Sequence, residues 1–510
     1  MMEAMLDDTS TSTPAVKAPG RVWLRPAHVL IALTVLAAAV RLLTVDRQSL
    51  WLDESYALED IHRSFGAMLS WVDAKEGSPP LYFVLVWGWV KALGSGTVAL
   101  RSLSVLAGIA TVPLVYLAGS TLASRRAGLV AAALTVVSPL MIWYSQEARP
   151  YALLVALCAA SLWCAGRAAN GGSWRWLAAW AATSALALAT HFFAGFLIAG
   201  EAVWLLAVLR RRALPASLAV VAAQLALLPL ALGGAQHSGT QWIGRLPLHL
   251  RLAQVPDQFL FGPGEAAVSH RAAAALALAI ATAAAVLVVR SGDRRGRRAV
   301  RLWSVLAAGC VAGPLVAALV GADYLDARNL MVAWVPLVLV VGVAAAAPRS
   351  RLVGGALAWG ACGLLAAGSV AIFARSDLQR ENWRAVAHAL GAPAGSRALL
   401  VPAAGRTLLD YLPRLTWDVD RHQRVSEIDV IGARVPSAQG LACWWGGVCA
   451  LPRQLIPGDL PRGFTQIERR RVGPFIVARY AATRPHRVSL HRATFYRVHH
   501  NYAVFFAVQR

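Results

Sequence analysis

The chain has 510 residues, of which 57% are hydrophobic and 15% are charged, and its mean hydropathy is +0.54. Ordinary soluble domains carry about 25% charged residues, so this composition excludes a soluble globular protein. The formal net charge of +23 does not indicate nucleic-acid binding. The arginines gather in alternate short loops and in the C-terminal part, without a zinc-finger or RNP-type pattern.

Residues 1–27 are polar and then basic, and we expect them to form a cytoplasmic tail. They lack the short apolar core and small-residue cleavage site of a signal peptide, so the first apolar run is predicted to be a retained anchor. The chain then repeats apolar runs that are long enough for membrane-spanning helices. The predicted spans are 28–45, 99–119, 127–145, 150–168, 174–190, 194–210, 214–232, 270–290, 301–320, 329–347 and 352–373.

Clusters of arginine in alternate loops predict the orientation of these spans. Short cytoplasmic loops of membrane proteins carry an excess of basic residues. The basic clusters are Arg125-Arg126, Arg167 to Arg175, Arg210 to Arg212, Arg290 to Arg301 and Arg349 to Arg351. Placing all of them in the cytoplasm puts residues 46–98 and everything after Phe373 on the outer side.

Residues 80–94 form an apolar run that does not fit as a crossing. The run is short and rich in aromatic residues, and counting it as a span would invert the charge pattern of every later loop. We predict a helix lying in the outer interface, where Trp and Tyr are favoured. A short tilted span is the alternative.

Residues 376–510 have the composition of a soluble domain, after a transmembrane domain over 28–375 with its outer loop at 46–98. Residues 382–390 have helical spacing, and 397–403, 473–481 and 502–509 have strand character, which predicts a small α/β domain. Cys443 and Cys449 frame a Gly-Gly pair there. On the outer side these two cysteines are candidates for a disulfide, and a metal site is the weaker alternative because partner ligands are missing.

The acidic pair Asp53-Glu54 follows the first span, inside the Trp-containing stretch LWLDESYALED. An inverting sugar transfer from a phosphate donor needs a carboxylate that accepts the proton of the attacking hydroxyl. The two acids are therefore candidate catalytic residues. The alternative is that they stabilise the N-terminus of a helix through capping and the helix dipole.

Other charged residues of the outer loops are candidates for binding substrate. Glu147 and Arg149 share a short outer connection, where a carboxylate can bind hydroxyls and an arginine a phosphate oxygen. Arg328 heads a late span and can stabilise a departing lipid phosphate. His191 can bind phosphate or acceptor. The alternatives are ion pairs at the interface, contact of Arg328 with lipid headgroups, and a packed histidine.

Three ionisable residues near or inside spans are expected to have structural roles. For Arg41 and Arg101 we favour contact with lipid headgroups at outer helix ends. Glu201 falls in the middle of a predicted span, too deep for chemistry at the outer face. We expect Glu201 to bind a neighbouring helix.

The chain resembles the GT-C superfamily of polyprenyl-phosphate-sugar-dependent glycosyltransferases. It is most similar to the family 39 kind, which includes protein O-mannosyltransferases, and to the lipid A aminoarabinose transferases. The stretches that carry this resemblance are 49–58, 78–94, 99–154 and 327–342. The resemblance implies an α-helical multispanning membrane bundle of about eleven helices, followed by a small extracytoplasmic α/β domain.

The resemblance also implies roles for single residues. The family's catalytic base corresponds to Asp53, with Glu54 beside it, and its second-loop acid corresponds to Glu147. The arginine that approaches the lipid phosphate corresponds to Arg328, and Tyr82 is a candidate substrate contact. The chain departs from the family where Ser78 replaces the usual histidine and where Asn329 replaces the usual tyrosine, and both departures bear on the substrate.

We therefore expect a multi-pass plasma-membrane enzyme that moves a sugar, with mannose favoured, from a polyprenyl-phosphate donor to a glycan, lipid or protein acceptor of the cell envelope. No cofactor is required in this hypothesis, although Asp53 and Glu54 could hold Mg²⁺ through oxygen ligands. The alternatives are a transporter or flippase of a lipid-linked sugar and an inactive scaffold. A transporter often has internally repeated halves, which this sequence lacks.

Overall fold

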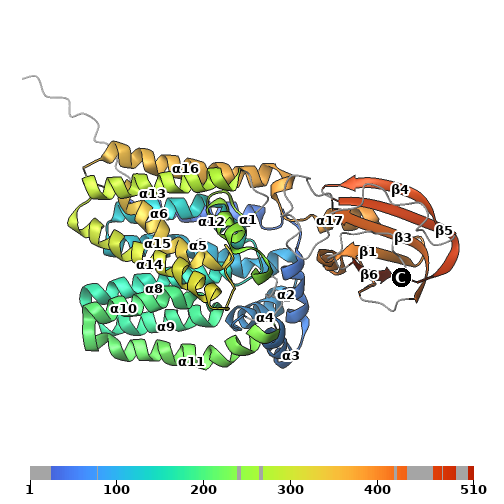
Figure 1. Cartoon of the computed structure of the whole chain (residues 1–510), viewed down its shortest axis with the longest axis horizontal. Helices are drawn as coiled ribbons and strands as arrows, with labels where there is room; N and C mark the ends of the chain where they lie inside the picture. Colours follow the sequence, from blue (N-terminus) through green and yellow to red (C-terminus); the bar gives the residue numbers. More distant parts are fainter. Residues whose placement is uncertain are drawn as a thin grey trace, which may run out of the picture.

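The computed structural model describes residues 25–76, 78–237, 243–263, 268–347, 349–417, 422–433, 463–473, 475–489 and 504–510. It consists of a helical bundle and a smaller sheet domain at one end of that bundle (Figure 1). Cys443 and Cys449 lie outside the described residues, so the disulfide stays a prediction.

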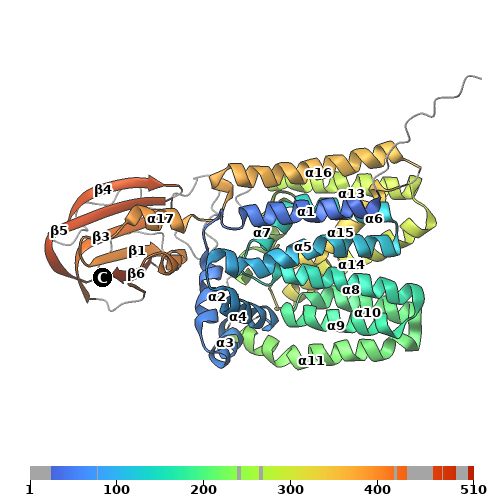
Figure 2. The same ribbon diagram turned by 180° about the vertical axis from the view of Figure 1, so that it is seen from behind.

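The bundle is built from long apolar helices that run along its length (Figures 1 and 2). Its helices are α1 (Pro26–Thr44), α5 (Thr97–Leu122), α6 (Arg125–Val137), α7 (Pro139–Ser145), α8 (Tyr151–Gly171), α9 (Trp174–Thr190), α10 (Ala194–Leu209), α11 (Leu214–His237), α12 (Leu248–Phe261), α13 (His270–Ser291), α14 (Arg294–Leu319), α15 (Trp334–Ala345) and α16 (Arg351–Ala374). The multispanning helical fold that the sequence predicts is confirmed.

Among the described residues, seven helical stretches are long and apolar enough to cross a membrane, or eight if one bent pair counts as a span. Each of the eleven predicted spans coincides with a helix or that bent pair. Two of them, α9 and the helical stretch Asn329–Ala345, are 17 residues long. The number of crossings therefore stays a prediction.

The bent pair corrects one predicted span. Residues 127–145 do not form a single helix, because α6 and α7 meet at an angle of 62°. Pro139 has no N–H to continue the hydrogen bonds of α6, and the Ser138 hydroxyl instead accepts a hydrogen bond from the Met141 N–H and caps α7. The bend carries the chain from the membrane bundle to residues 143–149, which form one wall of the candidate site.

The predicted basic loops meet one another at the end of the bundle away from the sheet domain. The Arg295 guanidinium donates to the carbonyls of Thr121 and Leu122 at 2.7 and 3.2 Å, across two of these loops. The hydroxyls of Ser291 and Ser350 join the loop that holds Arg295 to a third basic loop. These basic loops therefore lie at one end of the bundle, opposite to the predicted outer loops, as the charge pattern predicted.

Short helices cover the opposite end of the bundle, next to the sheet domain (Figures 1 and 2). They are α2 (Leu52–His62), α3 (Phe65–Trp71) and α4 (Leu81–Leu93). The 13 residues of α4 would extend only about 20 Å, less than the hydrocarbon thickness of about 30 Å. The sequence of residues 80–94 predicted such a short helix rather than a membrane span. The location of α4 in the membrane interface stays a prediction.

The C-terminal domain has one mixed sheet with the strand order β2-β6-β1-β3-β5-β4. Among the described strands, β1 and β3 pair in parallel and the other neighbours pair antiparallel. The strands are β1 (Arg397–Pro402), β2 (Leu415–Trp417), β3 (His422–Ala433), β4 (Thr465–Val472), β5 (Phe475–Ser489) and β6 (Val504–Gln509), and the helix is α17 (Trp383–Leu390). The predicted helix and the three predicted strands are confirmed, whereas β2, β3 and β4 were missed.

The sheet domain packs α17 against one face of its sheet. Trp383 and Leu390 lie in one apolar cluster with Leu399, Val401 and Phe475. Because side chains alternate along a strand, the neighbouring β1 residues Ala398 and Leu400 fall in a separate cluster on the other face. The placement of α17 determines where the preceding linker, residues 375–382, enters the bundle.

Candidate functional site

Four segments far apart in the sequence meet at the end of the bundle that faces the sheet domain (Figure 1). They are residues 45–51 with the adjoining start of α2, residues 143–149, residues 321–329 and the linker 375–382. Several charged groups with little or no exposure to solvent lie among them. Such groups are costly to bury unless they are paired, so their partners identify what the site is built for.

Asp53 lies in the first turn of α2 and faces Arg328. Its Oδ2 accepts a hydrogen bond from Arg328 Nη1 at 3.1 Å, and the Asp53 side chain is 24% exposed. Asp326 approaches the same guanidinium, with 3.6 Å between its Oδ1 and Arg328 Nε. The sequence reasoning named Asp53 and Arg328 separately, and the structure brings them into contact.

Contacts from α12, a helix that the sequence did not predict, hold the segment that carries Arg328. Arg251 of α12 makes a two-pronged ion pair with Asp323, with distances of 2.7 and 2.6 Å. The same guanidinium donates to the Leu325 carbonyl at 2.6 Å. These contacts order the turn before Arg328 and so determine the position of its side chain.

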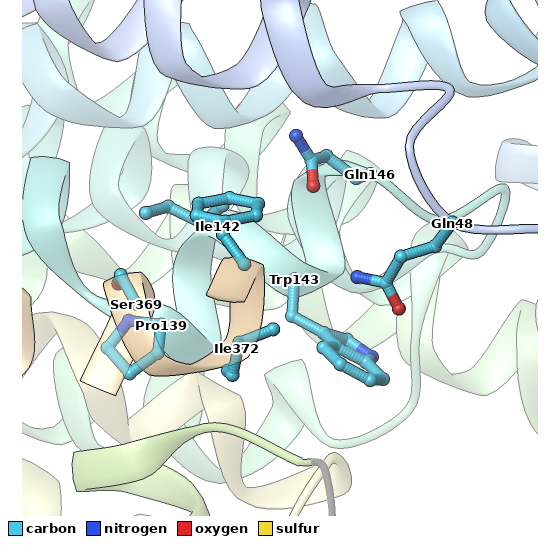
Figure 3. Close-up of a pocket in the computed structure, with 8 residues that line it drawn as sticks. Gln48, Pro139, Ile142, Trp143, Gln146, Ser369 and Ile372 are labelled. Carbon is cyan, nitrogen blue, oxygen red and sulfur yellow. The ribbon is translucent and has the colours of Figure 1, made fainter. Parts of the chain in front are cut away.

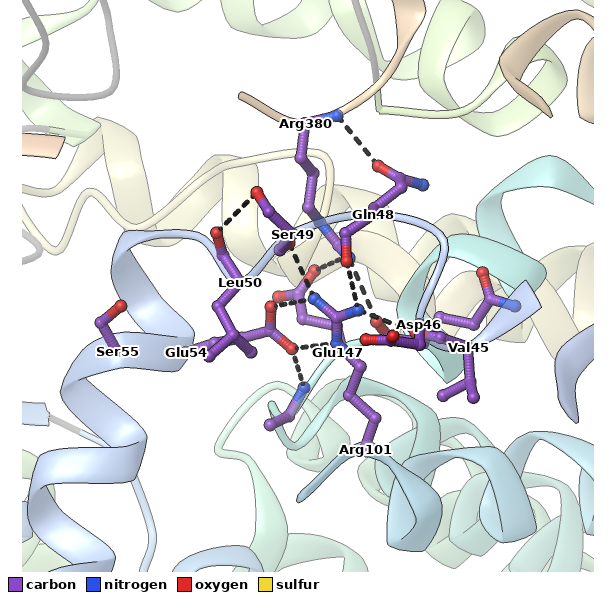
Figure 4. A network of polar contacts seen from close by, with 12 residues as sticks. Val45, Asp46, Gln48, Ser49, Leu50, Glu54, Ser55, Arg101, Glu147 and Arg380 are labelled. Carbon is purple, nitrogen blue, oxygen red and sulfur yellow. Dashed lines mark hydrogen bonds and ion pairs between the residues drawn. The ribbon is translucent and has the colours of Figure 1, made fainter. Parts of the chain in front are cut away.

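Glu54, the neighbour of Asp53, is fully buried and committed to Arg101 (Figure 4). Arg101 Nε donates to Oε1 at 2.7 Å and Nη2 donates to Oε2 at 2.6 Å, while the Ala148 N–H also donates to Oε1 at 2.9 Å. Burial alone would raise the pKa of Glu54, but the Arg101 charge and hydrogen bonds hold that pKa below its usual value. This geometry corrects two expectations, because Glu54 has no free oxygen for catalysis and Arg101 does not reach lipid headgroups.

Arg101 also organises the chain that leads into α2. Its Nη1 donates to the carbonyls of Val45 and Gln48 at 2.8 and 2.9 Å, and its Nη2 donates to the Ser49 carbonyl at 2.9 Å. These carbonyls follow the last turn of α1 and are not part of a helix. One buried arginine of α5 therefore fixes both the loop before the Asp53 helix and the helix itself.

Glu147 is fully buried and pairs with Arg380 of the linker. Arg380 Nη2 donates to Glu147 Oε2 at 2.6 Å. Burial raises the pKa of Glu147 to about 7, against the opposing effect of the Arg380 charge, with Glu54 and Asp53 raising that pKa further. Glu147 was predicted as a substrate-binding residue, and its partner was not predicted at all.

Two other predicted substrate contacts have partners within the protein. Arg149 Nη1 donates to Glu76 Oε2 at 2.7 Å, and the Arg149 guanidinium lies 5.7 Å from the centre of the Phe83 ring. The Tyr82 side chain is fully buried, with its hydroxyl 2.9 Å from that of Ser104. Arg149 thus fits the ion-pair alternative in this structure, and Tyr82 lies in the packing between α4 and α5.

His191 follows α9 and lies beside the same polar end. Its Nδ1 accepts a hydrogen bond from the Phe193 N–H at 3.2 Å, and its ring centre lies 5.8 Å from that of Tyr151. Burial, together with the positive charges of Arg149 and Arg328, lowers the pKa of His191 to about 3. A neutral packed histidine, the alternative that the sequence favoured, matches this environment.

Two ionisable residues named from the sequence lie away from the site. Glu201 accepts hydrogen bonds from Trp180 Nε1 at 2.8 Å and from the Ser161 hydroxyl at 3.2 Å, so it binds neighbouring helices as predicted. Arg41 is fully buried, and its Nε donates to the Ser145 hydroxyl at 3.1 Å. Its expected contact with lipid headgroups is therefore wrong.

The sequence reasoning missed several residues that pair with charged side chains of the site. Arg380, Glu76, Asp326 and Arg251 each complete an ion pair at this end of the bundle. Arg380 carried one usable signal, since it follows the last predicted span on the predicted outer side. Nothing in the local sequence indicates which carboxylate it meets, 233 residues earlier in the chain.

A small cavity lies beside the docked linker, between α7 and α16 (Figure 3). Gln48, Trp143, Gln146 and Ile372 are among its lining residues, and its volume is about 10 Å³. This space holds at most about one water molecule, so it is not a donor or acceptor pocket.

The acidic pair does not fit the predicted magnesium site. Both oxygens of Glu54 are occupied by Arg101 and the Ala148 N–H, so Glu54 cannot join Asp53 in coordinating one ion without breaking the buried ion pair. Over the part of the chain that the structure describes, no group of three or more His, Cys, Asp or Glu side chains is placed to hold a metal.

Comparison with known proteins finds a family match over part of the chain. Residues 77–232 match the family model described as dolichyl-phosphate-mannose-protein mannosyltransferase. The matched segment includes Tyr82, Glu147, Arg149 and His191, while Asp53 and Arg328 lie outside it. No curated protein matches the chain.

Several solved membrane transferases resemble the fold. ArnT from Cupriavidus metallidurans bound to undecaprenyl phosphate has a TM-score of 0.49 and 13% identity, over 75% of this chain and 85% of that one. The S. cerevisiae protein O-mannosyltransferase complex bound to the sugar donor has a TM-score of 0.34 and 18% identity, over 41% of this chain and 33% of that one. The Archaeoglobus fulgidus oligosaccharyltransferase AglB, in complex with an inhibitory peptide and a dolichol-phosphate, has a TM-score of 0.43 and 12% identity, over 72% and 58% of the two chains.

The protein is a multi-pass membrane enzyme of the glycosyltransferase class. The match of residues 77–232 to a mannosyltransferase family agrees with the glycosyltransferase resemblance of the sequence. The transporter and scaffold alternatives gain no support, because the matching family consists of transferases. The roles of single residues rest on the geometry of this chain.

Proposed function

We propose that the protein is an inverting glycosyltransferase that moves a sugar from a polyprenyl-phosphate donor to an acceptor hydroxyl of the cell envelope or of a protein. A mannose-like sugar is favoured by the family that matches residues 77–232. The undecaprenyl phosphate, dolichol-phosphate and sugar donor bound to the similar transferases support a lipid-linked donor.

The observation that carries the proposal is the contact between Asp53 and Arg328. A carboxylate with part of its surface exposed lies 3.1 Å from a nearly buried guanidinium, at the end of the bundle where the predicted outer loops meet. This reaction needs one group that accepts a proton and one that stabilises phosphate charge. Asp53 and Arg328 supply both within one hydrogen-bond length.

In the proposed step, Asp53 accepts the proton of the acceptor hydroxyl while the hydroxyl oxygen attacks the anomeric carbon. The bond from that carbon to the phosphate oxygen breaks, and its electron pair leaves with the polyprenyl phosphate. Arg328 stabilises the growing negative charge on the phosphate through charge-assisted hydrogen bonds. Attack from the face opposite to the phosphate inverts the anomeric centre.

We place this chemistry, and the C-terminal domain with it, on the extracytoplasmic side of the plasma membrane. The basic loops gather at the other end of the bundle, and such loops favour the cytoplasm. An acceptor exposed on the cell envelope would reach Asp53 from that side. The step uses no resident cofactor, because base and phosphate-binding group are both side chains of this chain.

Replacing Asp53 by Asn tests the proposal. With purified protein, labelled polyprenyl-phosphate mannose and membrane acceptors, we expect Asp53→Asn to lower transfer by about 10³-fold, since the amide cannot accept the proton. The thermal unfolding temperature should stay near that of the wild type. Asp73→Asn is the matched control, because Asp73 is an exposed acid of the same outer segment. Near-normal turnover of the Asp53 variant would refute the assignment.

A further inference from the structure

The linker between the last bundle helix and the sheet domain enters the candidate site. α16 ends at Ala374 and α17 begins at Trp383, and between them the chain passes the buried end of the bundle. Arg380 is only 9% exposed, although a linker of this kind is ordinarily open to solvent. Burying a guanidinium group costs solvation free energy, so a buried arginine is expected to have hydrogen-bond or ion-pair partners.

Arg380 has such partners, and most of them lie around Glu147 (Figure 4). Nη2 donates to Glu147 Oε2 at 2.6 Å and to the Trp143 carbonyl at 3.4 Å, and Nη1 donates to the Gln146 carbonyl at 3.1 Å. The guanidinium also lies 4.5 Å from the centre of the Trp143 ring. The planar head group of arginine matches this combination of a carboxylate, two carbonyls and a ring face.

The linker backbone is tied to the chain that leads into the Asp53 helix. The Arg380 N–H donates to Gln48 Oε1 at 2.9 Å, and the Ser49 hydroxyl donates to the Glu381 carbonyl at 2.7 Å. The Trp383 N–H in turn donates to the Ser49 hydroxyl oxygen at 3.2 Å. The linker thus joins two walls of the site, the segment before α2 and the segment that carries Glu147.

The sheet domain continues this contact beyond the linker. Its Tyr411 hydroxyl accepts a hydrogen bond from the Leu50 N–H at 2.7 Å, and Asp410 accepts one from the Ser55 hydroxyl. Arg406 forms an ion pair with Glu59 of α2. Because these contacts hold the sheet domain against α2 and the segment before it, the position of that domain determines whether the linker can occupy the site.

Glu147 keeps one oxygen for another partner. Its Oε2 is bound by Arg380, while the equally buried Oε1 has no hydrogen-bond partner among the described residues. A buried acceptor without a donor is costly, so such an atom points to a ligand that supplies one. Sugar and acceptor hydroxyls are donors of this kind.

We propose that Arg380 is a positioning residue, which holds Glu147 so that its second carboxylate oxygen binds a hydroxyl of the sugar or acceptor, and that transfer therefore requires the docked C-terminal domain. This inference rests on the proposed glycosyltransferase function. It assigns to the C-terminal domain a direct part in assembling the site.

The electrostatics of Glu147 provide a readout beyond the rate. Arg380 lowers the pKa of Glu147 against the raising effect of burial, so loss of Arg380 must raise that pKa above about 7. If the ionised form binds the hydroxyl, the acid side of the pH–rate profile then moves to higher pH. The other charged or titratable groups that act on Glu147 or respond to it are Asp53, Glu54, Tyr82, Arg101, Tyr144, Arg149 and Tyr151.

The experiment compares substitutions of Arg380 in the full-length protein, with labelled polyprenyl-phosphate mannose as the donor. We expect Arg380→Gln to lower kcat by about 10- to 100-fold, because a displaced binding group costs this much. The acid limb should move up by about one pH unit or more. Arg380→Lys keeps the charge and should restore the wild-type limb with only part of the rate. Arg384→Gln is the control, because Arg384, four residues after Arg380, forms an exposed ion pair with Asp46. The transfer rate of this variant should change less than two-fold.

A double substitution separates positioning from mere stability. If Arg380 acts through Glu147, adding Arg380→Gln to Glu147→Gln should cost less than two-fold beyond Glu147→Gln alone. Independent, multiplying losses would overturn the inference, as would a wild-type rate and pH profile in Arg380→Gln. If Arg380→Gln fails to fold, Arg380→Lys and the double variant test the inference instead. The double variant has glutamine at both positions and so leaves no unpaired buried charge. Absence of transfer by the wild type would instead overturn the underlying function.

Discussion

The two neighbouring acids at the start of α2 have opposite surroundings. Asp53 is partly exposed and accepts a hydrogen bond of 3.1 Å from Arg328. Glu54 is fully buried and receives three hydrogen bonds of 2.6 to 2.9 Å from Arg101 and Ala148. Successive residues on a helix point about 100° apart, so one acid faces the open site while the other faces α5. An acidic pair in the sequence therefore does not imply an acidic pair in the site.

The comparison assigns each acid a separate task. Glu54 and Arg101 join α2, α5 and the segment before α2, and so determine where Asp53 is presented. Among the residues that the structure describes, the tie of Asp53 is to Arg328, the residue that we propose to bind the phosphate. Variants of the two acids should accordingly fail in different ways, through loss of folding for Glu54 and through loss of chemistry for Asp53.

The largest effect on stability is expected from Glu54→Gln. Removing one partner of a buried ion pair leaves the Arg101 charge uncompensated, which costs about 3–5 kcal/mol of unfolding free energy. Chemical unfolding in detergent measures this cost. Glu59→Gln is the control, because the half-exposed Glu59 pairs should contribute less than about 1 kcal/mol each. Equal stability of the two variants would remove the structural role of Glu54.

The same pair predicts how stability depends on pH. The pKa of Glu54 is lower in the folded protein than its usual value of 4.5. The pair therefore contributes its full stability above the unfolded-state pKa, and this contribution is lost as the pH falls towards the folded-state pKa. The Glu54→Gln variant should lose less stability than the wild type on acidification below about pH 4.5.

A smaller effect, confined to the reaction, is expected from Arg328→Gln. Loss of the charge that stabilises the departing phosphate should lower kcat by about 10²-fold, within the range known for such groups. Arg328→Lys should retain more activity, because it keeps the charge but loses the planar geometry. Single-turnover rates with bound donor measure the difference. If both variants transfer sugar at the wild-type rate, Arg328 does not bind the leaving group.

The smallest effect is expected from removing divalent metal. Because Arg101 and the Ala148 N–H occupy Glu54, the acidic pair should not require Mg²⁺, and EDTA should change the transfer rate less than two-fold. Rates measured before and after chelation, and after Mg²⁺ is restored, test this. A collapse that Mg²⁺ reverses would show that Asp53 works with a metal held by other ligands.

The predictions from sequence succeeded where the signal was local. The apolar runs predicted the helices of the bundle, and strand-like segments predicted β1, β5 and β6. The strongly amphipathic stretch around Trp383 predicted α17. The break at Ser138-Pro139 was missed, although a proline with a capping serine before it is a recognisable signal for a new helix start.

The candidate site was only half predictable. Asp53, Glu147 and Arg328 stand out because charged residues at the outer ends of apolar spans are unusual. Arg380, the partner of Glu147, is less distinctive, since a sequence rich in arginine offers many equivalent candidates. Glu54 was misjudged for the same reason, because its identity and spacing do not reveal what lies across from it.

The sequence by itself determined that this protein is a helical membrane protein with its basic loops at one end and its candidate acids at the other, because hydrophobic periodicity and charge are properties of short segments. Only the tertiary structure decided which arginine neutralises which acid, and hence which carboxylate is left for chemistry. The physical reason is that a buried charge is stable only beside an opposite charge. For Glu147 that opposite charge comes from the linker, 233 residues away along the chain.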